Sequence, residues 1–404
     1  MSIPKPSEDS NGKPRALLIA PEVPYPVAGG GPLRTASLLE YLAARYSLDV
    51  ITFHEPGNPH PASLFPEGLV ERLDVIELPF HSQAALARVL RNADRFARGA
   101  PPLVDRFSGF SEQIRAILAD RSYDLAVVEH FWCAGYVKIL RERCKRVVLD
   151  LHNVESVLLA RCGDSHGRLL GTAFKRFAAA CRRMECELLP QFTDVLVCSS
   201  EDAEEARACA PKVRVTVYPN SIPYCSVPFR NKGNSIVFSG NMRYAPNRSA
   251  AQFFHRCVWP LVRKQWPDLT WQLVGRESEC LPKELRFDPS VQVIGAVKDA
   301  VEALAGARVA VAPLLAGSGT RLKIIEAWAA GVPVVSTTVG AEGLPAESGK
   351  NLLVADTPHD FASAISSLLA SEELCNRLAT NARQHFERSL NWSAAWLLLE
   401  AAGY

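Results

Sequence analysis

The sequence predicts an α/β protein with two similar domains, each built on a parallel sheet. Three observations support this. Short apolar runs alternate with helical patterns in the first half of the chain, the alternation restarts in the second half, and a stretch without periodicity separates the two. With 404 residues, the chain is long enough for two such domains. We therefore expect two Rossmann-like domains with a ligand cleft between them.

The first domain is expected at 15–218, after a polar, proline-bearing lead-in at 1–14 that should be disordered. Its strands are predicted from apolar runs, which suit a parallel sheet that is buried on both faces. The predicted strands are 16–20, 48–53, 75–80, 125–129, 146–151, 194–200 and 213–218. A glycine triplet follows the first strand and leads into a helix predicted at 33–46.

A hinge is expected at 219–234, where proline, asparagine and glycine are dense, and the second domain at 235–386. Its predicted strands are 235–240, 269–275, 291–297, 308–313, 332–337 and 351–355, and its predicted helices are 250–265, 297–305, 321–330, 360–370 and 372–386. The apolar segment 387–404 is expected to be a helix that returns to the first domain. Capping of the second domain is the alternative.

Composition narrows the class of protein. The net charge of +2 argues against a bulk nucleic-acid binder. No run approaches the roughly 18 apolar residues of a membrane-spanning helix, and no signal-peptide core is present. We therefore expect a cytoplasmic protein that contacts a membrane only peripherally. The 11 cysteines are scattered without a C-x-x-C pair, which indicates buried thiols rather than a zinc site or a disulfide.

The stretch 309–338 carries the clearest chemical signal. An apolar strand runs into a Gly/Ser/Thr loop, a helix begins there, and a second apolar strand follows. The free amides at such a helix start bind anions. Arg321 and Lys323 lie in the first helical turn, where cations oppose the helix dipole, and Glu326 could accept hydrogen bonds from vicinal hydroxyls. We interpret this unit as the site for the diphosphate and ribose of a nucleotide sugar, with ordinary helix capping as the alternative. The loop residues concerned are Gly317, Ser318, Gly319 and Thr320.

Five motifs in order give the chain a family resemblance. They read PYPVAGGGPLR, DLHNVES, SGNMRYAPN, VGRES and AGSGTRLKIIEAWAAGVPVVSTTVGAEGL. Together they resemble the family-4-type retaining glycosyltransferases, which have the two-domain GT-B fold, and the resemblance covers nearly all of the chain. PYPxxGG, FSGNMRYAPN and GTRLKIIEA are similar to bacterial transferases that assemble surface polysaccharides and other glycoconjugates. The resemblance implies transfer of a sugar from a nucleotide diphosphate sugar to an acceptor hydroxyl.

The resemblance also assigns roles in the second domain. Family members carry two glutamates separated by seven residues. The second is Glu326, implied to bind the donor ribose, whereas Ser318 stands in the place of the first, so the donor sugar end departs from the family pattern. Asn241 and Arg243 follow the first strand, where the family places an arginine against the diphosphate.

A lysine that usually follows this arginine is missing, and 246–247 stand near its place. We expect Lys323 to replace it. Gly275 and Arg276 are expected to border the nucleotide, with a surface arginine as the alternative.

In the first domain, glycines and a histidine follow predicted strands. Gly29, Gly30 and Gly31 would let backbone amides approach the transferred sugar or its phosphate, or would simply permit a tight turn. His152 follows a buried strand and is expected to contact the donor sugar or the acceptor, with a structural histidine as the alternative. The pair at 129–130 is a weaker candidate of the same kind.

No metal ion or cofactor is expected. The chain has no D-x-D triplet, which argues against a diphosphate-bridging divalent metal and suits helix amides and cations instead. Retaining enzymes of this type are thought to use the leaving phosphate as the base, so no dedicated base is assigned. The expected partners are a nucleotide sugar donor and a saccharide, lipid-linked or other small-molecule acceptor. A nucleotide-sugar epimerase and a non-catalytic sugar-nucleotide-binding partner are the alternative functions.

One surface feature concerns membranes. Arginines recur at three- and four-residue spacing and would fall on one side of a helix, with apolar residues opposite. Such a helix could lie on an anionic membrane and meet a lipid-linked acceptor. Alternatively, its arginines are solvated and its apolar side packs on the core. The arginines are Arg88, Arg91, Arg95 and Arg98.

Overall fold

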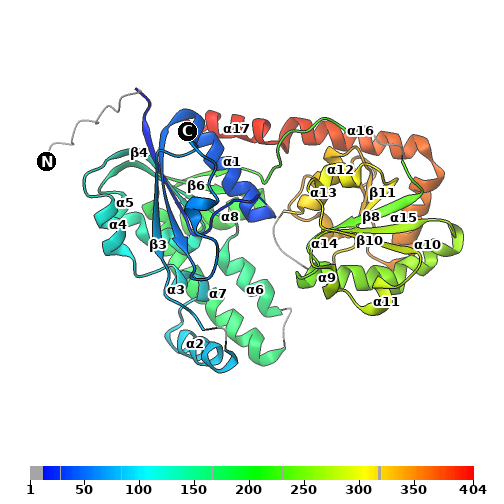
Figure 1. Cartoon of the computed structure of the whole chain (residues 1–404), viewed down its shortest axis with the longest axis horizontal. Helices are drawn as coiled ribbons and strands as arrows, with labels where there is room; N and C mark the ends of the chain where they lie inside the picture. The colour runs from blue at the N-terminus through cyan, green and yellow to red at the C-terminus, as the bar shows by residue number, and fades with distance from the viewer. Residues whose placement is uncertain (1–11, 28, 83, 165–166, 229–231, 317–319) are drawn as a thin grey trace. The chain divides into compact units, whose positions relative to one another are not determined.

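The computed structural model describes residues 12–27, 29–82, 84–164, 167–228, 232–316 and 320–404. The chain divides into two units (Figure 1). Unit 1 runs to Pro219 and includes Ala402–Tyr404, and unit 2 is Asn220–Ala401. Each unit contains a parallel sheet with helices, so the predicted fold class of two parallel-sheet α/β domains is confirmed.

The unit 1 sheet has the strand order β3-β2-β1-β4-β5-β6-β7, and every pairing is parallel. Its central strands are buried on both faces, as the apolar runs predicted. All seven predicted strands are present, although β3 begins and ends three residues earlier than expected. The strands are β1 (Arg15–Ala20), β2 (Ser47–His54), β3 (Arg72–Glu77), β4 (Tyr123–Glu129), β5 (Cys144–Asp150), β6 (Asp194–Val197) and β7 (Arg214–Val217).

Helices follow most of these strands, as crossover connections between parallel strands require. They are α1 (Gly30–Arg45), α2 (Ala85–Arg98), α3 (Pro102–Arg106), α4 (Ser111–Ile117), α5 (Val137–Leu140), α6 (Glu155–Asp164), α7 (Arg168–Leu188) and α8 (Ser200–Cys209). Helix α1 begins at Gly30, three residues before the predicted start. Gly30 and Gly31 therefore form its first turn, and Gly29, with φ of 104°, is the residue before the helix.

The unit 2 sheet has the order β10-β9-β8-β11-β12-β13, again all parallel. All six predicted strands are present. They are β8 (Ser235–Ser239), β9 (Thr270–Val274), β10 (Val291–Gly295), β11 (Val309–Ala312), β12 (Val334–Ser336) and β13 (Leu353–Val354).

The unit 2 helices are α9 (Ala245–Phe253), α10 (Trp259–Gln265), α11 (Lys283–Arg286), α12 (Ala300–Leu304), α13 (Leu322–Ala329), α14 (Thr338–Ala341), α15 (Pro358–Ala370), α16 (Glu372–Ser389) and α17 (Trp392–Ala401). A π-helical turn, Phe254–Val258, joins α9 and α10 where one continuous helix was predicted. Helix α17 groups with unit 2, and only the last three residues group with unit 1, where the Tyr404 carbonyl accepts a hydrogen bond from the Tyr41 hydroxyl.

The strand order fixes where functional side chains gather. In each sheet the chain starts at a central strand, proceeds to one edge and then resumes on the other side of that strand. These switch points are the β1/β4 pair in unit 1 and the β8/β11 pair in unit 2. Ligands of open α/β sheets bind beyond the carboxyl ends of strands at such a point. The loops after β1, β4, β5, β8, β9 and β11 are therefore the positions to examine.

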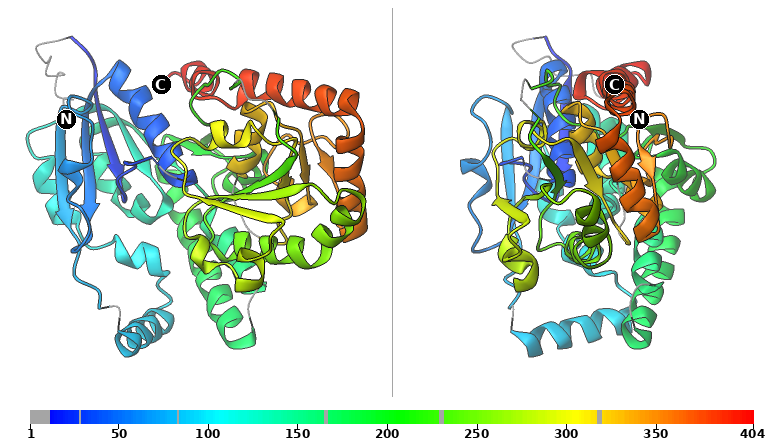
Figure 2. Two further views of the ribbon diagram at one scale, coloured as in Figure 1. Left: turned by 45° about the vertical axis from the view of Figure 1, so that its right-hand side comes forward. Right: turned by 90° about the vertical axis from the view of Figure 1, so that its right-hand side faces the viewer.

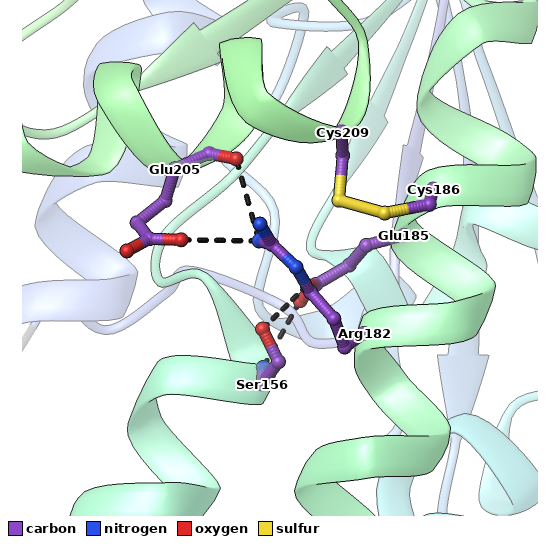
Figure 3. The surroundings of a disulfide bond; sticks show 6 residues. All are labelled: Ser156, Arg182, Glu185, Cys186, Glu205 and Cys209. Carbon is purple, nitrogen blue, oxygen red and sulfur yellow. Dashed lines mark hydrogen bonds and ion pairs between the residues drawn. A yellow bond between two sulfur atoms is a disulfide. The ribbon is translucent and has the colours of Figure 1, made fainter.

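The expectation that all cysteines are free thiols is wrong for one pair. Cys186 near the end of α7 and Cys209 at the end of α8 form a disulfide (Figure 3). Arg182 bonds to Glu205 across the same two helices. The two cysteines are 23 residues apart, and their spacing in the sequence gives no sign that helix packing brings them together. The other nine cysteines, all among the described residues, form no disulfide.

Two views of the ribbon show the helices of each unit arranged around its sheet (Figure 2). Among the described residues, no helix combines the length and the apolar character that crossing a bilayer requires.

Candidate functional site

The carboxyl edge of the unit 2 sheet brings several of the predicted donor-site residues together. The loop after β8 carries Asn241 and Arg243, and the loop after β9 carries Gly275 and Arg276. Helix α13, which follows β11, carries Lys323 and Glu326. These segments meet at the β8/β11 switch point.

Two glycines let the loops after β8 and β9 pack backbone against backbone. A Cβ atom on Gly275 would lie 1.9 Å from the carbonyl oxygen of Gly240, and the φ of Gly275 is 143°. A Cβ atom on Gly240 would lie 2.6 Å from Asn247 Nδ2 and 3.1 Å from Lys323 Nζ. The absence of a side chain at Gly275 therefore lets the loops after β8 and β9 lie in direct backbone contact, which a Cβ atom there would prevent.

Lys323 reaches the place where the resemblance expects a lysine. Its Nζ donates to Asn247 Oδ1 at 2.7 Å, and Asn247 in turn donates from Nδ2 to the Asn241 carbonyl at 2.9 Å. The ammonium also lies 4.2 Å from the centroid of the Phe238 ring on β8. Asn247 stands next to the position of the missing lysine, so a side chain from α13 brings the positive charge to that part of the edge.

Burial lowers the pKa of Lys323 to about 7, while Glu326 acts in the opposite direction. The structure therefore holds an ammonium whose charge is poorly compensated by the protein. An anion at this position would stabilise the charged form.

Glu326 lies one turn beyond Lys323 on α13. The pKa of Glu326 is raised overall, mainly by burial and in part by Asp299. The charge of Lys323 and a hydrogen bond with Ser239 act in the opposite direction. Its carboxylate therefore lies near the end of β8. A half-buried carboxylate beside a cation is suited to accept hydrogen bonds from neutral hydroxyls.

Arg243 is exposed and is positioned by its backbone. Its amide donates to Asn241 Oδ1 at 2.8 Å, which closes a turn directly after β8. The guanidinium is 77% exposed and lies 3.6 Å from a Glu277 carboxylate oxygen. Arg276 is also exposed, and its carbonyl accepts from the Met242 amide, which ties the loops after β8 and β9 together.

Arg321 and Thr320 take positions that differ from the prediction. Helix α13 begins at Leu322, so Arg321 precedes the first turn. Its buried guanidinium donates to the Val339 carbonyl at 3.1 Å and lies 3.8 Å from Glu342, so it holds α14. The Thr320 hydroxyl accepts from Asn220 Nδ2 at 3.0 Å. The predicted loop residues Gly317, Ser318 and Gly319 lie outside the described residues.

Unit 1 places a second polar cluster at the β1/β4 switch point. Asp150, the last residue of β5, is fully buried and accepts hydrogen bonds from the guanidinium of Arg34 on α1, at 2.8 Å from Nε to Oδ2. Arg34 also donates to the Tyr218 carbonyl. Burial raises the pKa of Asp150, but Arg34 and His152 outweigh this and hold the pKa well below its usual range. The pair is a buried charge pair that fixes α1 to β5.

His152 lies against two carboxylates. Its Nε2 lies 2.7 Å from Glu129 Oε2 and 3.4 Å from Asp150 Oδ2. Burial lowers the pKa of His152, but Glu129 and Asp150 together raise it to about 9, so the ring is protonated at neutral pH. The other ring nitrogen, Nδ1, points toward Gly31, where an added Cβ would lie 3.8 Å away. The structure thus brings the predicted His152 and the glycines of α1 together.

Glu129 completes this cluster. Its Oε2 also accepts from the Thr35 hydroxyl at 2.6 Å, while its Oε1 is buried and has no hydrogen-bond partner among the described residues. A buried acceptor without a donor is uncommon and suits a site that receives a hydroxyl.

His130 is the most strained residue of the cluster. Its φ is +63°, which is unfavourable for a residue with a Cβ atom. The ring stacks between His152, at a centroid distance of 3.6 Å, and Trp132, at 4.1 Å. Burial and the charge of His152 lower the pKa of His130 well below its usual value. His130 is therefore neutral beside a cationic neighbour.

Trp132 links this stack to a buried carboxyl group. Its indole nitrogen donates to Glu155 at 2.9 Å. Burial raises the pKa of Glu155 to about 7, although the bond from Trp132 lowers it. The sequence identified Glu129 and His130 as a weaker candidate pair, gave Asp150 and Glu155 no role beyond flanking His152, and did not indicate Trp132.

Glu129, His130 and His152 offer potential metal-ligand atoms within 4.8 Å of one another. A protonated imidazole cannot ligate a cation, and His152 Nε2 is already engaged by Glu129. The donor set therefore fits an ion-paired histidine better than a metal centre. The prediction that no metal is bound remains a prediction.

Comparison with known families matches each half of the chain. Residues 28–224 match the model described as Glycosyltransferase Family 4, and residues 233–371 match the model described as Glycosyl transferases group 1. A curated relative is 21% identical over 91% of this chain and 94% of its own length. It is an uncharacterized 44.6 kDa protein in the cps region of Klebsiella pneumoniae.

Solved structures have the same fold. Sucrose-phosphate synthase from Thermosynechococcus elongatus is 18% identical with a TM-score of 0.69, covering 96% of this chain and 98% of its own. HepE from Anabaena, in complex with UDP, is 16% identical with a TM-score of 0.66, covering 96% and 99%. A TarM mutant from S. aureus, in complex with UDP and other ligands, is 13% identical with a TM-score of 0.64, covering 96% and 99%. Each of these structures is therefore similar to this chain in fold.

Proposed function

Because this chain belongs to the glycosyltransferases of the GT-B type, we propose that it moves a sugar from a nucleotide diphosphate sugar to an acceptor hydroxyl with retention of the anomeric configuration. The observation that carries the proposal is the cluster at the β8/β11 switch point. There a poorly compensated ammonium, an exposed arginine and a half-buried carboxylate share one sheet edge. Cations suit a diphosphate, and the carboxylate suits the hydroxyls of a ribose.

Each of these side chains has a proposed role. Lys323 and Arg243 neutralise the diphosphate, and they stabilise the charge that develops on it as the bond to the sugar breaks. Glu326 binds the ribose. Asn241, Gly275 and Arg276 border the nucleotide, and the loop 317–320 contributes amides to the phosphates. We assign Arg321 a supporting role. It directly precedes α13, and its guanidinium holds α14 through the Val339 carbonyl.

The cluster of unit 1 is proposed to contact the transferred sugar or the acceptor. Protonated His152 and neutral His130 offer a cation and a weakly basic imidazole, and Glu129 has an unused acceptor oxygen. Gly29, Gly30 and Gly31 would let backbone amides approach the sugar or its phosphate, and an added Cβ atom on Gly31 would lie 3.8 Å from His152 Nδ1. We assign no general base, because in a front-face displacement the leaving phosphate takes the acceptor proton.

The biological setting is part of the same proposal. The relative in the cps region of Klebsiella pneumoniae supports a role in surface polysaccharide or glycoconjugate synthesis. HepE has been solved with UDP-glucose, which makes UDP-glucose the first donor to try. The acceptor is a saccharide, a lipid-linked sugar or another small molecule. In this proposal the enzyme needs no metal ion and no cofactor. It acts in the cytoplasm, in peripheral contact with the inner face of the membrane.

A thermal-shift experiment tests donor binding. UDP and UDP-glucose should raise the melting temperature of the full chain. At a hundredfold excess over Kd, the ligand adds about 2.7 kcal/mol to the free energy of unfolding. Glu326→Gln should reduce the shift, because the ribose loses a charged hydrogen-bond acceptor. Glu302→Gln on α12, an exposed glutamate of the same unit, is the matched control and should keep the full shift. Equal shifts in all three proteins would remove Glu326 from the site.

A further inference from the structure

Helix α2 turns its apolar side outward and its charged side toward the rest of unit 1, which is the reverse of the usual arrangement in a globular protein. Its apolar residues and its arginines lie on opposite sides, as the sequence predicted. However, the side that is turned toward unit 1 is formed by Ala87, Arg91 and Arg95, of which Arg95 is buried. Leu86, at 71% exposed, faces out. The alternative expectation, that the arginines are solvated and the apolar side packs on the core, is therefore wrong.

Helix α2 exposes several large apolar side chains, and we call these, with the exposed apolar residues of neighbouring segments, the α2 surface. Its helical members lie at positions i, i+3 and i+4, and neighbouring segments add to it. A soluble protein does not usually leave so many large apolar side chains exposed in one place. The members are Phe80, Leu86, Val89, Leu90, Phe96, Leu103 and, on α7, Leu170. Figures 1 and 2 show α2 in light blue, apart from the strands of unit 1.

The arginines explain why α2 is held this way round. Arg95 pairs with Asp105 of α3 at 2.8 Å, and Arg98 pairs with Asp105 and Asp94. These bonds fix α2 to α3 through its charged side. Arg176 of α7 lies over the ring of Phe96, in the same C-terminal part of α2.

Positive charge remains after this pairing. Arg106 donates to the Pro79 carbonyl and lies near Glu55, yet its Nη2 has no hydrogen bond among the described residues, and neither does the Nε of Arg91. Burial and the neighbouring arginines lower the pKa values of both Arg106 and His81. Residues 80–106 contain five arginines and two aspartates, a net charge of +3, whereas the whole chain carries only +2.

We propose that the α2 surface docks on a bilayer that contains anionic phospholipid. Leu86, Val89 and Leu90 enter the boundary between headgroups and acyl chains, and the exposed Arg88 attracts the lipid phosphates. This combination, apolar residues on one side of a helix and arginines on the other, is that of helices that lie in a membrane interface. The inference specifies the membrane contact of the proposed function and does not depend on sugar transfer.

Charge favours a bilayer over a second copy of the chain. Two α2 surfaces placed face to face would bring two sets of arginines with a net charge of +3 each close together. An anionic leaflet instead supplies charge opposite to the net charge of +3 carried by residues 80–106.

Flotation of the full chain with vesicles tests this proposal. Wild-type protein should float with phosphatidylcholine vesicles that contain phosphatidylglycerol, and much less with phosphatidylcholine alone. Leu86→Ser with Leu90→Ser should weaken partition at least about tenfold, because exposed apolar area is removed without a change of charge. Arg88→Gln should weaken it about fivefold, and only on the anionic vesicles.

Phe287→Ser is the matched control, because Phe287 is 76% exposed in unit 2, and this variant should float like wild type. Equal flotation of the serine pair and wild type, or no flotation of wild type, would overturn the proposal. So would a lipid-free dimer that the serine pair dissociates, since the α2 surface would then bind a second copy. All variants should retain UDP-induced thermal stabilisation, which separates failure of docking from failure of the donor site.

Discussion

Lys323 and Asn247 illustrate chemistry that depends on two residues 76 positions apart. The sequence has an asparagine beside the place where a lysine is usual, and a lysine on a distant helix. The structure joins them by a 2.7 Å hydrogen bond. The sequence could suggest that Lys323 replaces the missing lysine, because Lys323 lies in the predicted phosphate-binding stretch. It could not show the contact, which depends on the packing of α13 against β8 and α9.

The lowered pKa of Lys323 leads to a prediction about pH. Free enzyme has a neutral Lys323 above about pH 7, whereas a bound diphosphate favours the charged form. Donor binding therefore takes up a proton above pH 7, and the affinity for UDP-glucose should fall as pH rises, by up to about tenfold per pH unit. Calorimetric titration from about pH 6 to about pH 9 measures this, and the diphosphate of UDP-glucose does not itself titrate in that range.

Lys323→Met should bind UDP-glucose weakly and with no such pH dependence. Lys264→Met, which changes an exposed lysine on α10, is the control and should keep the wild-type profile. A flat profile in wild type would show that Lys323 does not face the diphosphate.

The unit 1 cluster was only partly accessible from sequence. The position of His152 after a buried strand indicated a residue at the sheet edge, and the structure places it there. The Arg34–Asp150 pair spans 116 residues, and the stacking of His130 depends on a positive φ that no motif encodes. Long-range pairs of this kind are fixed by the strand order, which the alternation of strands and helices leaves undetermined.

At the scale of elements, apolar runs predicted every strand of both sheets, because parallel strands buried on two faces are continuously apolar. Helix ends were less predictable. Arg321 was placed in the first turn of its helix, but that helix begins at Leu322, and Arg321 bonds to the carbonyl of Val339 instead. Helix α2 was correctly divided into two faces. Which face turns inward could not be read from the sequence, because Asp105 of α3 decides it.

The contact of the loops after β8 and β9 can be tested with one methyl group. Gly275→Ala would place a Cβ atom 1.9 Å from the Gly240 carbonyl oxygen at a strained φ. The free energy of unfolding of unit 2 should fall by about 2–4 kcal/mol, because backbone cannot move aside as a side chain can. Denaturant unfolding measures the loss.

Gly306→Ala provides the comparison, since its added Cβ would have no atom within 4 Å and its φ is not in the left-handed region. That variant should unfold like wild type. Equal stability of the two alanine variants would mean that the loops do not approach as closely as the structure indicates.

At the scale of the whole molecule, the repeated alternation predicted two parallel-sheet units, and both halves match glycosyltransferase families. We propose that Lys323, Glu326 and Arg243 of unit 2 hold the nucleotide end of the donor. At the sugar end, the family resemblance implies a glutamate at the position of Ser318, which lies outside the described residues. We therefore expect the choice of sugar to depend on unit 1 residues such as His152 more than it does in relatives with both glutamates.

The central claim is that this enzyme transfers sugar with retention and uses Lys323 and Glu326 to hold the donor. The most direct measurement is turnover of UDP-glucose with a panel of saccharide and lipid-linked acceptors, with the anomeric configuration of the product read by NMR. The account predicts an α-linked product from the α-linked donor, and loss of most turnover in Lys323→Met and Glu326→Gln while the fold is retained. A β-linked product, or near-wild-type turnover in both variants, would contradict it.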